Sequence, residues 1–293
     1  MRDDLFLFYF QFMKYVCLSG EIVNGESPLL FVTNRSYRYG DGLFETIKVT
    51  DGNISLEEYH FNRLFESLAT MCYKIPPFFT RDTMGEQILL LCKKNKCTSL
   101  ARLRLSVFRG NGGLIESLDD MQYVIECWPL NSSFNKMNEN GLRIDIYPDA
   151  RKNSDRFSCI KSANFLPYVM AAKHAKENEL DDAIVLNVYD RIADTSVANI
   201  FVVKDNKLKT PPINEGCVNG VMRKFLIENF YKNELNLTVE ETPLSIDDLL
   251  SAEEIFLTNA ISGIKWVKQF RNQTYTNKVS SALFKDYLSP IWP

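Results

Sequence analysis

Residues 159–178 read CIKSANFLPYVMAAKHAKEN and place one lysine, Lys161, immediately ahead of a predicted helix. Ser162 or Asn164 could cap this helix, Pro167 suits its first turn, and the alanines that follow favour its propagation. A lysine is poorly placed here, because the helix dipole puts partial positive charge at the helix N-terminus. Lys161 is therefore either a surface lysine with its ammonium in water, or an amine held neutral so that it can attack a carbonyl.

The composition of the chain is typical of a soluble globular protein. Hydrophobic residues make up 45% of the 293 residues and charged residues 24%, and the length suits one large domain or two modest ones. The net charge of −3, without a block of Lys or Arg, argues against a nucleic-acid partner. The apolar run near the N-terminus follows Asp3 and Asp4, is short and lacks a cleavage site, so we expect neither a signal peptide nor a membrane span. These features predict a cytoplasmic protein.

The numbers and spacing of the cysteines and histidines limit the kinds of disulfide and metal site that the chain could form. The seven cysteines are scattered without a C-x-x-C pair, which favours reduced thiols over disulfides or a zinc site. His60 and His174 are the only histidines, too few for a multi-histidine metal centre. We therefore expect no metal.

The hydrophobic pattern predicts two α+β halves joined by a linker. Turns at Ser19-Gly20 and Asp51-Gly52 are expected to connect strands in the first half. Residues 128–141, WPLNSSFNKMNENG, are polar and rich in Asn and Ser, and are the best linker candidate. The predicted order along the chain is an N-terminal extension at 1–12, a small α/β domain at 13–127, the linker, and a larger domain at 142–293.

Lys161 has a possible acidic counterpart in the larger domain. Residues 182–210 are predicted to form strand, turn, strand, turn and strand, with Asp194 on a turn and Asn199 beginning the next strand. Taken alone, Asp194 is an ordinary Asx-turn residue. An amine and a carboxylate together suit an enzyme that binds an aromatic aldehyde phosphate. The amine can attach to the aldehyde, and the carboxylate can pair with the ring nitrogen of the ligand.

Two loops could hold the phosphate of such a ligand. In NGVMR, residues 219–223, Gly220 allows close backbone approach, and the amides of Val221 and Met222 open a predicted helix. In LTNA, Thr258 supplies a hydroxyl. Each loop could equally be an ordinary helix start or strand end, so neither signal is specific by itself.

The order of these motifs carries more information than any one of them. RYGDGLFETIKV, HFNRL, the lysine of CIKSANFL, RIADTSVANIF, NGVMRK and FLTNAISGI together resemble the fold-type IV, or class-IV, pyridoxal phosphate-dependent aminotransferase family. This family includes branched-chain aminotransferases, D-amino-acid aminotransferases and aminodeoxychorismate lyases. The resemblance runs from about Met13 to Trp266. It implies a two-domain α+β fold, with a small N-terminal α/β domain and a larger C-terminal domain with a pseudo-barrel of strands.

The resemblance also implies roles for individual residues. Lys161 looks like the Schiff-base lysine and catalytic acid–base group. Asp194 falls where the family usually has a glutamate, so the carboxylate that keeps the ring nitrogen protonated is one methylene shorter here. The implied cofactor-binding residues are Arg63, Lys161, Asp194, Gly220, Val221, Met222 and Thr258. The substrate-side candidates are Tyr39, Arg104, Arg109, Asn259 and Ala260. The resemblance implies a homodimer in which first-domain residues help to close each active site.

The motifs leave more than one possible reaction within the family. NGGLIE follows FRG without the Arg and His that D-amino-acid enzymes use to bind a carboxylate, and Leu114 stands where lyases typically carry an arginine. We favour an aminotransferase for L-amino acids of the branched-chain type, with a 2-oxo acid as acceptor. Aminodeoxychorismate lyase is the close alternative, since YGDGLFET and GCVNGVMRKF resemble lyases equally well. A relative that binds pyridoxal phosphate without catalysis is the third possibility, which the shorter Asp194 suggests and Lys161 argues against.

Overall fold

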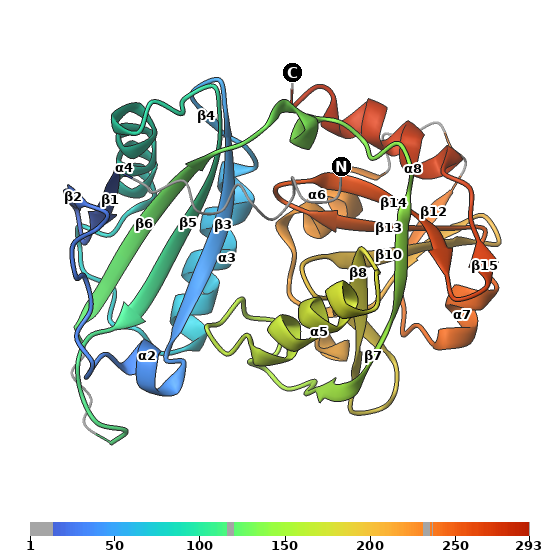
Figure 1. The fold of residues 1–293 in the computed structure, drawn as a ribbon, viewed down its shortest axis with the longest axis horizontal. Coiled ribbons are helices and arrows are strands. Elements are labelled where there is room, and N and C mark those ends of the chain that lie inside the picture. Colours follow the sequence, from blue (N-terminus) through green and yellow to red (C-terminus); the bar gives the residue numbers. More distant parts are fainter. Residues whose placement is uncertain (1–13, 116–119, 231–234, 236, 293) are drawn as a thin grey trace. The chain divides into compact units, whose positions relative to one another are not determined.

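The computed structural model describes residues 14–115, 120–230, 235 and 237–292, and the chain divides into two units, each with its own sheet (Figure 1). The first unit takes Met1–Ser55 with Leu64–Asn131, and the second takes Leu56–Arg63 with Ser132–Pro293. The predicted domain bounds, 13–127 and 142–293 with a linker at 128–141, stay a prediction. The predicted extension at 1–12 lies outside the described residues.

The first unit is built on a six-stranded antiparallel sheet, in the order β2-β1-β6-β5-β3-β4. The strands are β1 (Tyr15–Leu18), β2 (Glu21–Asn24), β3 (Gly42–Thr50), β4 (Asn53–Ile54), β5 (Leu100–Arg109) and β6 (Met121–Pro129). The predicted turns are confirmed, since Ser19-Gly20 connects β1 to β2 and Asp51-Gly52 connects β3 to β4. All four turn residues have positive φ, the conformation that two-residue hairpin loops require.

Helices complete the first unit. They are α2 (Arg35–Tyr39), the second half of α3 (Glu57–Thr70) and α4 (Arg81–Lys94). Helices α3 and α4 bury apolar side chains in the core of the unit. Helix α4 packs on β1 and β6, and buries Met84, Ile88 and Leu91. Burial alternates along β5, as expected for a strand with one face in the core.

The second unit contains a nine-stranded mixed sheet, in the order β12-β11-β10-β13-β14-β7-β8-β9 with β15 beside β14. The strands are β7 (Leu142–Lys152), β8 (Asp182–Asn187), β9 (Ile192–Thr195), β10 (Asn199–Lys204), β11 (Lys207–Thr210), β12 (Thr238–Glu241), β13 (Glu254–Asn259), β14 (Gly263–Phe270) and β15 (Gln273–Thr274). Strand β9 ends the hydrogen-bonded path and also contacts β10, so the sheet curls into a half-barrel. This curl matches the predicted pseudo-barrel.

Helices cover the curled sheet. They are α5 (Leu166–Glu177), α6 (Val221–Asn229), α7 (Ile246–Leu250) and α8 (Lys278–Leu283), with the short 3-10 helices η2 (Ser132–Asn135) and η3 (Ile213–Glu215) and the π-helix η5 (Phe284–Leu288). Helix α5 packs on β7 and β8, while α6 packs on β13. None of the described helices is long and apolar enough to cross a bilayer.

The residues after β15 are fastened to the centre of this sheet. The buried carboxylate of Glu254 on β13 accepts hydrogen bonds from the backbone amides of Val279 at 2.9 Å and Ser280 at 3.1 Å. A Cβ added to Gly263 of β14 would come within 2.0 Å of Leu288 and 2.3 Å of Trp292. The sheet therefore depends on the segment from α8 onward for part of its core.

Two local predictions were wrong. Helix α5 begins at Leu166 with Phe165 as its N-cap, and neither Ser162 nor Asn164 caps it, although Pro167 does lie in the first turn. Asp194 lies inside β9 rather than on a turn, because it pairs with Val185 of β8. The prediction that Asn199 begins a strand is confirmed.

Candidate active site

Lys161 lies in the loop that precedes α5, as predicted. Its side chain is half-buried, and Nζ lies 5.2 Å from the centre of the Phe165 ring. The start of the same loop is tied to a distant segment, because the carbonyl of Cys159 accepts a hydrogen bond of 3.0 Å from the amide of Asn219. The backbone therefore anchors the lysine loop beside the start of α6.

Asp194 is one of several buried acids of the second unit, with 2% of its surface exposed. Its Oδ2 accepts hydrogen bonds from the hydroxyl of Tyr168 at 2.7 Å and from the amide of Val218 at 2.9 Å. The ammonium of Lys152 lies 3.4 Å from the same oxygen and also donates to the hydroxyl of Tyr168. All three donors therefore hold one oxygen, and Oδ1 is buried with no partner in the described part of the chain.

Tyr168 stays protonated next to this carboxylate. Burial, followed by the negative charge of Asp194 and the hydrogen bond to it, raises the pKa of Tyr168 well above its usual value. The phenol therefore acts as a hydrogen-bond donor and fixes the orientation of the carboxyl group.

The residues around Gly220 form a tight backbone site. Gly220 is the N-cap of α6, and a Cβ there would lie 1.8 Å from Oδ1 of Asn199. The Asn199 side chain in turn donates to the carbonyl of Val218 at 2.8 Å. The amides of Val221 and Met222 lie in the first turn of α6, where backbone N–H groups have no partner within a helix. This geometry can receive an anion.

Arg63 and Thr258 belong to the same part of the second unit. Arg63, on the first half of α3, is 8% exposed and donates to the carbonyl of Asn219 at 2.9 Å. Thr258 on β13 pairs directly with Asn199 on β10. The Thr258 hydroxyl is buried and has no hydrogen-bond partner within the residues described.

One short segment, residues 217–220, connects these groups. Its backbone meets Asp194 and Asn199 at Val218, and meets Arg63 and the Lys161 loop at Asn219. The chain thus brings together residues that lie up to about 160 positions apart, and the resulting site combines an amine, a buried acid and a backbone cradle for an anion.

The remaining second-unit candidates lie on the loop after β13. The Asn259 side chain closes a turn, since its Oδ1 accepts hydrogen bonds from the amides of Ile261 at 3.0 Å and Ser262 at 2.7 Å. Ala260 follows it and is partly exposed. Their roles toward a substrate stay predictions.

The substrate-side candidates of the first unit have clear local partners. The Arg104 guanidinium lies 3.6 Å from the centre of the Phe44 ring, and its Nε donates to Ser106 at 3.0 Å. Arg109 pairs with Asp41 at 2.5 Å and stacks on Tyr73 at 4.1 Å. Burial lowers the pKa of Arg104 from its usual value.

Tyr39, the last residue of α2, has 39% of its surface exposed, with the Arg35 guanidinium 5.6 Å from its ring centre. Arg35 also bonds the carbonyl of Gly113 and, at 3.4 Å, that of Leu114. The arginine therefore links Tyr39 to the loop that contains Leu114. A substrate role for Tyr39 stays a prediction.

Sequence reasoning missed Tyr168, Lys152 and Val218. Tyr168 reads as a core residue of an amphipathic helix, and Lys152 as an exposed charge at a strand end. Both reach Asp194 only because β7, β9 and α5 meet in the folded unit. No local signal in the sequence could have identified them.

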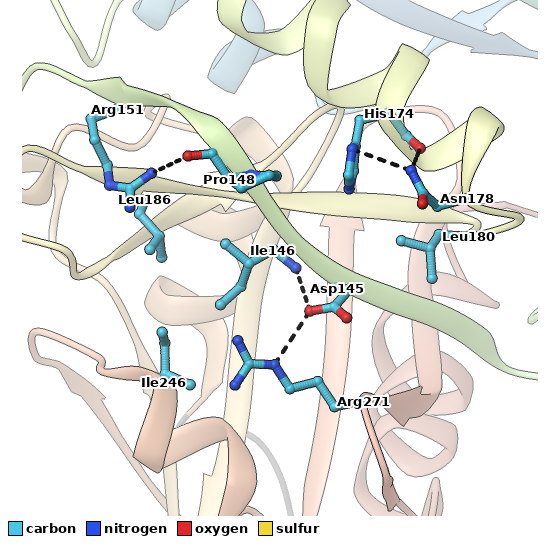
Figure 2. A pocket seen from close by; sticks show the side chains of 10 residues that line it. All are labelled: Asp145, Ile146, Pro148, Arg151, His174, Asn178, Leu180, Leu186, Ile246 and Arg271. Carbon is cyan, nitrogen blue, oxygen red and sulfur yellow. Dashed lines mark hydrogen bonds and ion pairs between the residues drawn. The ribbon is translucent and has the colours of Figure 1, made fainter.

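A separate pocket of about 600 Å³ lies in the second unit (Figure 2). Its walls include Ile146, His174 and Arg151, and Asp145 and Arg271 pair across it at 3.4 Å. None of the predicted site residues lines this pocket. Its arginines already have acidic partners, because Arg151 also pairs with Asp190 at 2.7 Å. The pocket is therefore distinct from the candidate active site.

Comparison with known proteins points to one family. The family model described as "Amino-transferase class IV" matches residues 42–270. A Methanocaldococcus jannaschii protein provisionally named a branched-chain-amino-acid aminotransferase is 29% identical over 272 residues, 90% of either chain. The aminodeoxychorismate lyase of Vibrio harveyi is 26% identical over 79% of this chain and 83% of its own. The branched-chain aminotransferase of Thermoproteus uzoniensis has a similar fold, with a TM-score of 0.83, 21% identity and 94% of each chain covered.

Proposed function

Because this chain belongs to the class IV aminotransferases, we propose that it uses pyridoxal phosphate to transfer the amino group of an L-amino acid to a 2-oxo acid. The favoured donors are branched-chain amino acids, the substrates named for several of the similar proteins. The observation that carries the proposal is the 217–220 segment, which joins the Lys161 loop, Asp194 and Arg63.

The residues present fit the cofactor. Among the buried polar atoms without a partner in the described residues are Asp194 Oδ1 and Thr258 Oγ1. A buried polar atom left without a hydrogen bond costs about 1–3 kcal/mol, so such atoms suggest a bound group. A protonated ring nitrogen would satisfy the carboxylate oxygen, and a phosphate oxygen would accept from the hydroxyl.

Each residue then has a separate task. Arg63 and the amides of Val221 and Met222 would hold the phosphate, with Gly220 leaving room for it. Asp194 would pair with the ring nitrogen through Oδ1, while Tyr168 and Lys152 hold its other oxygen. Lys161 supplies the primary amine to which the cofactor aldehyde attaches.

The chemistry divides between cofactor and chain. When bound, pyridoxal phosphate withdraws electrons from the α-carbon of the substrate and so makes the proton on that carbon acidic. The amine of Lys161 takes this proton and returns it, as a general base and then a general acid. Asp194 keeps a negative charge beside the ring nitrogen, and that charge holds the ring proton in place. Burial of Asp194 strengthens this interaction by excluding water.

Substrate recognition and assembly complete the proposal. We assign Tyr39, Arg104, Arg109, Asn259 and Ala260 to the substrate side, because the motifs that contain them resemble those of the family. We also propose a homodimer located in the cytoplasm, which agrees with the cysteines that form no disulfide in the described structure, namely Cys17, Cys72, Cys92, Cys97, Cys127, Cys159 and Cys217.

The second candidate function is that of an aminodeoxychorismate lyase, which would release pyruvate and 4-aminobenzoate. The similarity to the Vibrio harveyi lyase favours it. Both reactions need Lys161 and Asp194, so these residues do not separate them.

A substrate panel tests the proposal. The cofactor-loaded protein is incubated with 2-oxoglutarate and leucine, valine, isoleucine or D-alanine, and separately with aminodeoxychorismate. We expect glutamate from the branched-chain L-amino acids, none from D-alanine, and no aminobenzoate. Lys161→Ala is the control and should abolish every activity. Aminobenzoate and pyruvate without glutamate would favour the lyase.

A further inference from the structure

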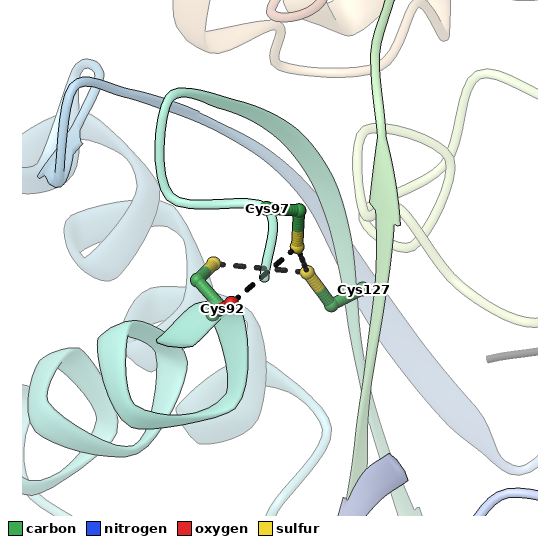
Figure 3. A group of neighbouring side chains, drawn as sticks. All are labelled: Cys92, Cys97 and Cys127. Carbon is green, nitrogen blue, oxygen red and sulfur yellow. Dashed lines mark hydrogen bonds between the residues drawn. The ribbon is translucent and has the colours of Figure 1, made fainter. Parts of the chain in front are cut away.

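Three buried cysteines of the first unit point their sulfurs at one place (Figure 3). Cys92 lies near the end of α4, Cys97 in the loop after it, and Cys127 on β6. Their exposed fractions are 0%, 3% and 2%, and their sulfurs all lie within 4.8 Å of one another. We call Cys92, Cys97 and Cys127 the thiol cluster. It has no part in the proposed amino transfer.

The end of α4 fixes the first two sulfurs. Lys96 has a positive φ of 56°, its amide bonds the carbonyl of Lys93, and the amide of Cys97 bonds the carbonyl of Cys92 at 3.0 Å. This pair of bonds is a Schellman motif, in which the residue after the left-handed position packs back on the last turn. Cys97 is therefore held against Cys92 by backbone geometry.

The third sulfur comes from the sheet, 35 residues from Cys92 along the chain. Cys127 Sγ lies 3.7 Å from Cys92 Sγ and 2.8 Å from Cys97 Sγ. Helix α4 packs on β6, so this position is set by the core of the unit. A helix-end motif explains the first two cysteines, but it does not explain why a third thiol meets them.

We propose that the thiol cluster binds a single soft, thiophilic cation of the Cu(I) class. Thiolate sulfur selects soft cations, and Cu(I) accepts three sulfur ligands. A structural zinc site needs four protein ligands, and no histidine or carboxylate joins the three thiols in the described part of the chain. The cation carries no redox step here, and each thiol that becomes a ligand releases its proton to water.

The distances agree with this occupant after a small adjustment. Three sulfurs bound to one metal at roughly 2.3 Å lie roughly 4.0 Å apart, and the Cys92–Cys127 separation of 3.7 Å is close to this value. Cys97 must retreat by about 1 Å from Cys127, and its neighbours Lys96, Thr98 and Ser99 are exposed. The same exposed loop offers an entry path.

Nearby charge also suits thiolate ligands. The segment from Cys92 to Cys97 reads CKKNKC, so Lys93, Lys94 and Lys96 lie between two of the three cysteines along the chain. All three lysines are exposed, so the surface of the segment that carries Cys92 and Cys97 is positively charged.

The test is an anaerobic titration of the fully reduced, full-length enzyme with Cu(I) in competition with a Cu(I) chelator. We expect one tightly bound equivalent per chain. Cys127→Ser and Cys97→Ser should each weaken binding at least about 100-fold, because each removes a ligand. Cys17→Ser is the matched control: Cys17 is also buried in this unit and its sulfur contacts Gln87 of α4, but it lies outside the cluster. Its affinity should equal that of the wild type.

X-ray absorption of the wild-type Cu(I) complex adds a readout that does not depend on how the variants fold, and it should find three sulfur neighbours. Equal Cu(I) affinity in the wild type and both cluster variants would overturn the proposal. So would a reduced wild type that binds no Cu(I) but loses two hydrogens on oxidation, which would mark a Cys97–Cys127 disulfide pair instead.

Discussion

The hydroxyl of Tyr168 lies 2.7 Å from Oδ2 of Asp194, and both side chains are buried. This contact joins helix α5 to strand β9, next to the loop that carries Lys161. It leaves Oδ1 as the oxygen of Asp194 that can meet a cofactor, so the orientation of the acid depends on a residue that the family motifs did not indicate.

Removal of the Tyr168 hydroxyl should therefore loosen Asp194. We expect Tyr168→Phe to weaken cofactor affinity about tenfold, or roughly 1.4 kcal/mol, because one donor to the carboxylate is lost. Tyr147→Phe is the matched control, since Tyr147 is a buried tyrosine of the same apolar cluster. Equilibrium binding of pyridoxal phosphate measures both. Equal losses in the two variants would show that the effect is one of general packing.

Asp194 itself should be needed for turnover more than for cofactor attachment. Asp194→Asn keeps the shape but removes the charge, and we expect kcat to fall at least about 100-fold while the cofactor still attaches to the protein. Asp194→Glu restores the residue usual in the family and should retain substantial activity. Steady-state kinetics and the absorption spectrum of the bound cofactor test both. A near-normal rate for Asp194→Asn would remove this residue from the mechanism.

Thr258→Val should stabilise the cofactor-free protein but weaken its binding of the cofactor. Loss of an unpartnered buried hydroxyl should stabilise the cofactor-free protein by about 1 kcal/mol, because valine has nearly the same shape and no polar atom. The same change should weaken pyridoxal phosphate binding, because a donor to the phosphate is lost. Thermal unfolding with and without cofactor measures the two effects. If Tm falls in both states, the hydroxyl has a structural partner.

Cofactor attachment should map to Lys161 alone. Borohydride reduction of the loaded protein followed by peptide mass mapping should place the pyridoxyl group on the peptide around Lys161. Lys152 provides the internal comparison, since it is the lysine 3.4 Å from Asp194. A label on Lys152 would reverse the roles proposed for the two amines.

Lys265 should make the stability of the protein depend on pH. Burial lowers the pKa of Lys265 to about 8, whereas an unfolded lysine titrates near 10.4. Between about pH 8 and pH 10.4 the unfolded chain binds more protons, so the contribution of Lys265 to stability rises with pH. Lys265→Met should therefore raise the free energy of unfolding by up to about 3 kcal/mol below pH 8, and the gain should vanish above about pH 10.5.

Denaturant unfolding at several pH values measures this difference. Lys268→Met is the control, because Lys268 is exposed on the same strand and should give no such trend. A gain for Lys265→Met that does not change with pH would point to packing rather than to the ammonium group.

The sequence predicted those parts of the site that depend on local chain geometry. Gly220 and the start of α6 follow from a glycine before a helix, and Lys161 from its place ahead of α5. The preference of Asp for Asx turns predicts a turn at Asp194, but this residue pairs with Val185 and lies in β9. Tertiary pairing overrode a local preference there.

The rest could not be predicted from local pattern. Three features depend on contacts between segments that are distant along the chain. They are the place of Leu56–Arg63 in the second unit, the hydrogen-bond donors around Asp194, and the meeting of three thiols. Hydrophobic periodicity identifies which residues are buried, but it does not identify their partners. Only the assembled sheets define these contacts.

The attachment of the segment after β15 to Glu254 and Gly263 has a consequence for biosynthesis. The core of the second unit needs Val279, Leu288 and Trp292, whereas the first unit has all its residues once Asn131 has been translated. At roughly 5–20 residues per second, a ribosome needs roughly 8–30 s to translate the intervening stretch. During that interval Leu56–Arg63 lacks its contacts with the rest of the second unit, so we expect a chaperone to bind the nascent chain at this helix.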